Sequence, residues 1–214
     1  KPLTAKQADM SLEWYYSSAS ALTFDGFFKA IKNGTYDQQM CPGTYSGTAL
    51  SVDSGGDCVD SAGNIYDISQ TKNDSRTARL LGYEAAWTQS FDQWLRIKGF
   101  GVTVNYTRVY PKYGSDANDG FTVRDLSERT WNATAFYEHH GFSARASLNH
   151  RSQYYQGEQD SFFADAGHEV KARTQLDLML GYAVNDRLSY SLSILNANGT
   201  REQAYRGNSL VWQE

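Results

Sequence analysis

The sequence lacks several features that would place it in familiar classes of protein. It contains only 3 prolines and 18 glycines among 214 residues, too few for a disordered or collagen-like chain. It has no apolar run of about 18 residues, which excludes a transmembrane helix. Neither sign of charge dominates, since 20 Lys and Arg stand against 24 Asp and Glu. Because no basic patch is present, we expect no nucleic-acid partner.

Low hydropathy does not exclude strands that cross a membrane. The mean hydropathy is −0.60, but a barrel strand needs only about 9–11 residues, of which every second one is apolar. Aromatic residues make up 14% of the sequence, an enrichment that suits both β-strands and membrane interfaces. The composition therefore leaves an outer-membrane barrel open.

Residues 169–184 alternate between apolar and polar side chains. One side of this segment carries Val170, Ala172, Leu176, Leu178, Leu180, Tyr182 and Val184. The other side carries Glu169, Lys171, Arg173, Gln175 and Asp177. The two-residue period predicts a strand with one apolar and one polar face. A short turn at 185–187 leads into residues 188–194, where apolar residues alternate with serines, so the two segments form a hairpin.

The rest of the chain repeats this arrangement. The other predicted hairpins join residues 9–16 to 22–29, 80–87 to 102–107, and 131–138 to 142–151. Connections within each pair are short or medium in length, whereas those at 33–75, 110–126, 156–168 and after 196 are long and polar. We therefore predict an all-β fold: an antiparallel, up-and-down transmembrane β-barrel segment of about eight strands, with short periplasmic turns and long extracellular loops.

A soluble β-sandwich is the alternative, because its strands also alternate. The sandwich fold does not require all long loops to lie at one end. It also does not require charges to lie on one strand face while the other face is apolar. Aromatic side chains also cluster beside the turns, which favours a membrane-interface girdle over ordinary strand enrichment. The girdle candidates are Trp14, Tyr15, Tyr16, Trp87, Trp131, Tyr137, Phe142, Tyr154 and Tyr155.

The two cysteines, Cys41 and Cys58, lie in a Gly-, Ser- and Asp-rich stretch within the first long connection. We predict a loop disulfide, which implies an oxidising compartment. The alternatives are two free thiols or a metal pair, but the spacing fits no common zinc pattern and no histidine is near. Asp53, Asp57 and Asp60 could hold calcium, although solvated loop acids are far commoner. We therefore predict no metal site.

Several short runs of residues, taken in their order along the chain, resemble those of a known protein family. They are Leu12-Glu13-Trp14-Tyr15, Phe28-Lys29-Ala30-Ile31-Lys32-Asn33, Gly99-Phe100-Gly101-Val102 with Asn105-Tyr106-Thr107, Trp131 to Glu138, Gly141 to Arg145 with Asn149-His150-Arg151-Ser152, and Val184-Asn185-Asp186-Arg187-Leu188 with Ile194-Leu195-Asn196. In this order they resemble the late barrel strands of TonB-dependent outer-membrane receptors. The resemblance covers nearly the whole chain.

The resemblance implies a barrel of about 22 strands with a plugged lumen. Residues 1–214 would form its C-terminal portion, with no plug domain and with the final strand missing. The expected partners are the lipid of the bacterial outer membrane, the rest of the barrel and its plug, and the TonB coupling protein, which acts through an N-terminal part outside this chain. The full-length protein would take up a large ligand such as an oligosaccharide or a ferric siderophore.

Candidate ligand contacts lie on the polar strand face and at the mouths of the loops. They are Tyr113, Arg145, Arg151, Tyr154, Tyr155 and Arg173. Tyrosines could stack on sugar rings and arginines could pair with anionic ligands. The alternative is that these charges pair with one another or with a plug, while the aromatics form the girdle.

No catalytic constellation is visible, and no cofactor is predicted. A G-x-S-x-G elbow is absent, and Gly99-Phe100-Gly101 lacks the third glycine of a dinucleotide fingerprint. We therefore do not predict an enzyme. Two function classes remain: a transport receptor, and a soluble secreted β-sandwich module that binds carbohydrate or mediates adhesion.

Overall fold

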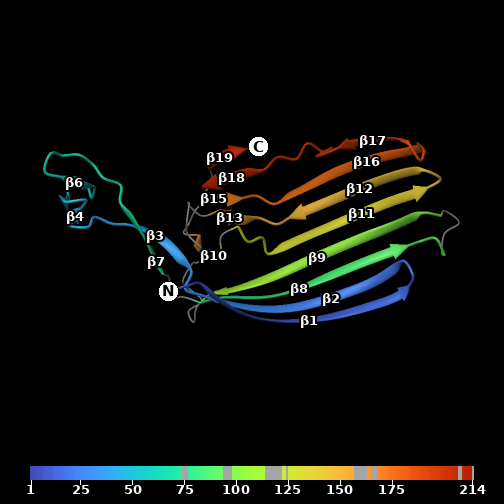
Figure 1. Cartoon of the computed structure of the whole chain (residues 1–214), viewed down its shortest axis with the longest axis horizontal. Helices are drawn as coiled ribbons and strands as arrows, with labels where there is room; N and C mark the ends of the chain where they lie inside the picture. The colour runs from blue at the N-terminus through green and yellow to red at the C-terminus, as the bar shows by residue number, and fades with distance from the viewer. Residues whose placement is uncertain are drawn as a thin grey trace.

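A single antiparallel sheet of eight long strands dominates the computed structural model, which describes residues 1–73, 77–93, 98–113, 122–123, 125–156, 163–164, 168–206 and 209–213. The strand order is β1-β2-β8-β9-β11-β12-β16-β17 (Figure 1). The bounds are β1 Thr4–Ser17, β2 Ser20–Lys32, β8 Thr77–Ser90, β9 Phe100–Tyr113, β11 Arg129–His139, β12 Phe142–Arg151, β16 Arg173–Asn185 and β17 Leu188–Ile194. Each of these eight strands pairs with the next of the eight along the chain, which confirms the all-β, up-and-down prediction. The sheet is open, with β1 and β17 as its edges.

The connections alternate in length as predicted. At one end of the sheet, residues 18–19, 140–141 and 186–187 form tight turns, and a somewhat longer connection separates the end of β8 at Ser90 from the start of β9 at Phe100. The described parts of the long connections and both termini lie at the other end (Figure 1). His140 and Gly141 have φ values of 50° and 76°, as a two-residue hairpin turn that follows the strand twist requires. A Cβ at Gly141 would also lie 2.7 Å from the Ala183 carbonyl oxygen.

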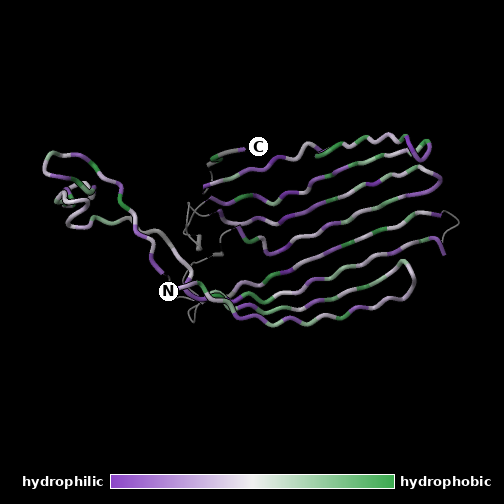
Figure 2. Tube along the Cα trace, viewed as in Figure 1, coloured by the Kyte–Doolittle hydropathy of each residue, from purple (hydrophilic) through white to green (hydrophobic). Residues whose placement is uncertain are grey.

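The pairing register separates two faces of the sheet. One row on the apolar face consists of Leu22, Trp87, Val104, Ala133, Leu148 and Leu176. The adjacent row on the polar face consists of Thr88, Thr103, Thr134, Ser147 and Asp177. Figure 2 shows the resulting alternation of hydropathy along each strand.

Large apolar side chains remain exposed on the apolar face. Leu12, Leu22, Leu148 and Leu192 are 67%, 42%, 39% and 57% exposed, and no second sheet packs over them within the described residues. An apolar surface of this extent needs an apolar environment or a partner. The sandwich alternative is therefore wrong for this sheet. The described residues contain no helix that is long and apolar enough to span a membrane.

A smaller sheet, the rim sheet, lies at the long-loop end. It consists of β13 (Tyr154–Gln156), β15 (His168–Val170), β18 (Gln203–Arg206) and β19 (Ser209–Gln213), in the order β13-β15-β18-β19. Its core is formed by Tyr154, Val170 and Ala204, all of which are buried. Nearby, β10 (Thr122–Val123) pairs with β14 (Phe163–Ala164).

The rim sheet corrects the prediction of one continuous strand over 169–184. The strand divides at Lys171 and Ala172 into β15 and β16. The Lys171 amide donates a hydrogen bond of 2.9 Å to the Gln203 carbonyl, so the chain changes partners at this point. Val170 consequently belongs to the rim-sheet core, not to the apolar face that carries Leu176. Tyr110, expected in a loop, instead lies within β9.

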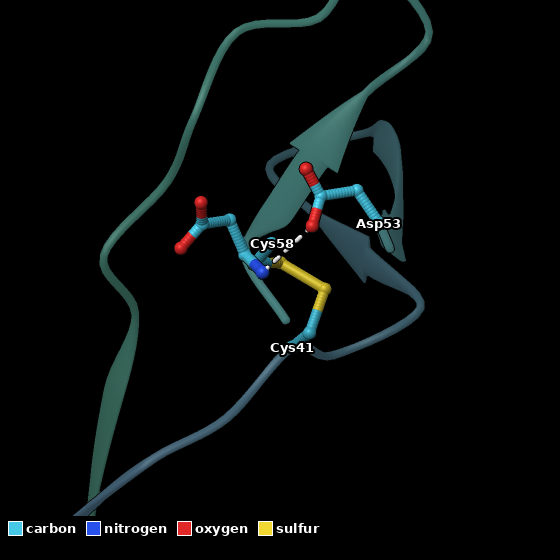
Figure 3. The surroundings of a disulfide bond; sticks show 4 residues. Cys41, Asp53 and Cys58 are labelled. Carbon is cyan, nitrogen blue, oxygen red and sulfur yellow. Dashed lines mark hydrogen bonds between the residues drawn. A yellow bond between two sulfur atoms is a disulfide. The ribbon is translucent and has the colours of Figure 1, made fainter. Parts of the chain in front are cut away.

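The first long connection folds into an arm that projects away from the main sheet (Figure 1). A ribbon of β3 (Thr35–Gln39) and β7 (Ser69–Asn73) leads to a head made of β4 (Thr44–Tyr45), β5 (Thr48–Val52) and β6 (Cys58–Asp60). A disulfide joins Cys41 to Cys58, with 5.2 Å between their Cα atoms, and confirms the sequence prediction. Figure 3 shows it beside Asp53, whose carboxylate accepts the Asp57 amide at 2.9 Å.

We expect Ala146→Arg to lower the free energy of unfolding in a lipid bilayer by about 2–4 kcal/mol, because it places a charge in the middle of the apolar face. Ser147→Arg, one residue further on the polar face, is the matched control and should cost much less. Denaturant titration of both variants in lipid vesicles measures the difference. Equal losses would contradict the assignment of faces.

Replacing both Cys41 and Cys58 by serine should loosen the head and leave the main sheet intact. The bond closes a loop with a sequence separation of 17, for which chain entropy predicts about 3 kcal/mol. Limited proteolysis should then cleave within residues 41–58 of the double variant and spare the same segment in the parent protein. Unchanged protection of this segment would show that the disulfide does not stabilise the head.

Candidate functional site

Hydrogen bonds connect neighbouring strands on the polar face. The Asn149 amide nitrogen donates to Asp177 Oδ2 at 3.1 Å, and the Gln175 amide nitrogen donates to Asp177 Oδ1 at 2.8 Å. Thr134 and Ser147 hydroxyls lie 2.8 Å apart, and Asn132 donates to Asn149. The face is thus a wall of amide and hydroxyl groups whose geometry is fixed by mutual hydrogen bonds.

Three of the predicted contact residues meet where β12 and β16 end. Arg151 and Arg173 lie opposite each other in the register. Their like charges repel each other unless an anionic group lies nearby. Glu202 compensates this repulsion, since its Oε2 lies 3.3 Å from Arg173 Nη1 and its Oε1 accepts the Tyr154 hydroxyl at 3.2 Å. The Arg151 guanidinium stacks on the Tyr154 ring at 3.7 Å. These four residues, Arg151, Tyr154, Arg173 and Glu202, form the rim cluster.

The loop after β9 holds Arg151 in place from its other side. Arg151 Nε donates to the Ser127 hydroxyl at 2.7 Å, and Nη2 donates to the Asp125 carbonyl at 2.8 Å. Burial raises the pKa of the Tyr154 phenol above its ordinary value, although the nearby Arg151 opposes the shift. The phenol therefore stays protonated at neutral pH and can donate to Glu202.

The other candidates are not part of the rim cluster. Tyr155 is 37% exposed and lies on β13 beside the rim cluster. Arg145 points from the polar face near the tight turns and pairs with Glu138 at 2.9 Å. Arg151 lies six positions further along β12, about 20 Å along a strand. The backbone of Tyr113 pairs with Ala78 at the long-loop end of β9, while its side chain lies outside the described residues.

Sequence reasoning missed Glu202, Ser127 and Asp125. Asp125 and Glu202 lie in stretches predicted as polar loops, and Ser127 lies between such a loop and the next predicted strand. A signal for Glu202 did exist, because two predicted arginines on adjacent strands require a nearby anion. Its position could not be inferred, since it depends on how the chain folds back after residue 194.

The acidic residues of the arm act as structural groups. The Asp60 carboxylate accepts the Ala62 and Asn64 amides at 2.8 and 2.9 Å, and also the Asn64 side chain. Hydrogen bonds from Asn64 lower the pKa of Asp60 to about 2. No group of three metal-ligating side chains occurs in the part of the chain that the structure describes.

The rim cluster leads to a prediction for Glu202. Glu202→Gln should weaken the rim sheet by about 1 kcal/mol, because Arg173 then loses its partly exposed ion-pair partner. Hydrogen exchange should quicken at residues 154–156, 168–170 and 203–206 and stay unchanged in β11 and β12. Arg201→Gln, which removes a neighbouring exposed charge, serves as the control. The same acceleration in both variants would refute the role of Glu202.

Comparison with known proteins identifies the family to which this sheet belongs. The family model described as "TonB dependent receptor-like, beta-barrel" matches residues 1–197, a range that contains all eight strands of the main sheet. Neither a curated protein nor a solved structure matches the chain significantly. The meander, its segregated faces and this match agree, and the chain belongs to the β-barrel family of TonB-dependent receptors.

Proposed function

We propose that this chain forms part of the wall of a bacterial outer-membrane transporter that takes up an oligosaccharide or a ferric siderophore. The family consists of TonB-dependent receptors of the outer membrane. The observation that carries the proposal is the segregation of the two faces across the whole sheet. The apolar face would meet lipid, and the hydrogen-bonded polar face would line the lumen.

The height of the apolar face fits a membrane. Tyr106 and Trp131 form part of an aromatic belt at the long-loop end, and Phe142, Tyr182 and Tyr190 form one at the turn end. From Trp131 to the last residue of β11, His139, the strand advances about 26 Å, comparable with an apolar band of about 25 Å. Two girdle candidates do not fit: Tyr15 donates to Glu13 on the polar face, and Tyr154 lies in the rim-sheet core.

The edges of the sheet indicate which partners it needs. β1 and β17 each pair on one side only, and an unpaired strand edge is costly in lipid. We infer that further barrel strands cover both edges and that a plug occupies the polar side. Coupling to TonB would then act through the plug.

The chemistry of the polar side supports a large polar ligand. Amide and hydroxyl side chains form hydrogen-bonded rows on the wall, and an arginine and aromatic cluster stands at its loop end. The amides and hydroxyls suit a polyhydroxylated ligand, while Arg151 and Arg173 suit an anionic chelate. Both arginines already have partners within the chain, so a ligand would have to compete with Ser127 and Glu202.

The proposal predicts that uptake depends on the polar face. Cells that express the intact receptor should accumulate one member of a panel of labelled oligosaccharides and ferric siderophores, and only when TonB is present. Asn149→Leu should lower this uptake severalfold, because it removes an amide from the lumen wall. Leu148→Ile, the adjacent residue on the apolar face, should leave it unchanged. TonB-independent uptake, or equal effects of the two substitutions, would count against the proposal.

A further inference from the structure

Residues 34–71, which form most of the arm, carry charge of one sign only. They contain no Lys, Arg or His, and their charged residues are Asp37, Asp53, Asp57, Asp60 and Asp67. The head lies at the end of the arm that is distant from the main sheet (Figure 1). A surface whose charges all have one sign attracts molecules of the opposite sign. The head is therefore placed to meet a separate, positively charged molecule.

The carboxylates of the head divide into two groups. Asp53 Oδ1 accepts the Gly55 and Asp57 amides, both at 2.9 Å, and the Asp60 carboxylate likewise accepts backbone amides of its own turn. These two carboxylates hold the turns of the head. The carboxylates of Asp57 and Asp67, in contrast, accept no hydrogen bond and make no ion pair within the part of the chain that the structure describes. They are therefore available to a partner.

A groove beside the disulfide brings these two available carboxylates together with apolar side chains. Its volume is about 360 Å³. Its lining includes Met40, Val52, Ile68, Asp57, Asp67 and the Cys41–Cys58 disulfide. Val52 is 61% exposed, so apolar surface in the groove is open to solvent. This site, named here the head groove, therefore offers apolar surface and negative charge in one place.

Cross-links within the arm hold the head groove in its shape. The disulfide ties β6 to the segment that precedes β4, and β6 also pairs with β5. The Met40 amide donates to the Ile68 carbonyl at 2.9 Å, and the Tyr66 amide donates to the Cys58 carbonyl at 2.8 Å. A groove that is formed before its partner arrives loses little conformational entropy on binding.

The chemistry of the head groove favours a basic side chain. Ionised carboxylates only accept hydrogen bonds, and they form their strongest ones with cationic donors. Lys and Arg side chains combine such a donor with an aliphatic stem that packs on apolar surface. A polypeptide that presents Lys or Arg beside apolar residues therefore matches both parts of the groove. The head of a second copy of this chain does not match, because its charges have the same sign.

We propose that the head groove docks a separate cationic polypeptide outside the cell. A Lys or Arg side chain of this partner packs its stem on Val52 and pairs its charged end with Asp57 and Asp67. The site is distinct from the rim cluster, and the partner is not the transported ligand. Only the location of the head outside the cell rests on the proposed function, because binding in the groove depends on the arm alone.

The test selects a library of random short peptides on the intact receptor in detergent. We expect the enriched peptides to carry Lys or Arg next to an apolar residue. Fluorescence anisotropy then measures the affinity of the most enriched peptide, which should fall as the salt concentration rises. Asp57→Asn and Asp67→Asn should each weaken binding about threefold, as expected for a partly exposed ion pair. Val52→Thr, which replaces one methyl group by a hydroxyl, should weaken it about twofold.

Asp186→Asn is the matched control, because it removes the same charge from an exposed turn at the opposite end of the main sheet. It should bind the peptide as tightly as the parent receptor does. Enrichment without a preference for Lys or Arg, or an equal loss of affinity in Asp186→Asn, would overturn the inference. Dimerisation of the receptor that Asp57→Asn abolishes would also overturn it, since a second copy would then occupy the groove. A receptor that binds the peptide but transports nothing would instead contradict the proposed function alone.

Discussion

Backbone hydrogen bonding in lipid is the constraint on which the rest of this structure depends. A peptide group inside a bilayer finds no water, so every strand must pair with its neighbours along its length. The register runs without a shift from β2 through β16. Shifts in the main sheet occur only beside tight turns, at Tyr15/Ser17 and Ala183/Asn185. Because side chains alternate with a period of two, a slip of one residue would exchange the two faces.

Polar side chains replace strand pairing where the chain leaves the main sheet. After β17, the Asn198 side chain accepts the Leu176 amide at 3.0 Å and donates to the Thr174 carbonyl at 2.8 Å. One side-chain amide thus provides β16 with the hydrogen bonds that a neighbouring peptide group would make. Asn196, with a φ of 53°, turns the chain at this point. The same region brings Glu202 to Arg173 and Tyr154, so the candidate ligand site lies where the pairing constraint is relaxed.

Much of the main sheet could be predicted from sequence, because local alternation determines it. The hairpins and the pairing of Cys41 with Cys58 both follow from nearby residues. The division of strand 169–184 could not be predicted, since the alternation continues through Lys171 while a distant partner, Gln203, ends the strand. The rim sheet could not be predicted either, because its strands also pair with distant segments of the chain. Its strands are only three to five residues long, too short to show a period.

The central claim is that one face of the sheet meets lipid and the other meets water. Spin labels placed singly on Ala133 and Thr134, adjacent residues of β11 on opposite faces, test it directly in the intact receptor in bilayers. The label at 133 should collide mainly with dissolved oxygen, which concentrates in lipid. The label at 134 should collide mainly with a water-soluble nickel chelate. Equal accessibility of the two labels to the nickel chelate would contradict the assignment of the faces.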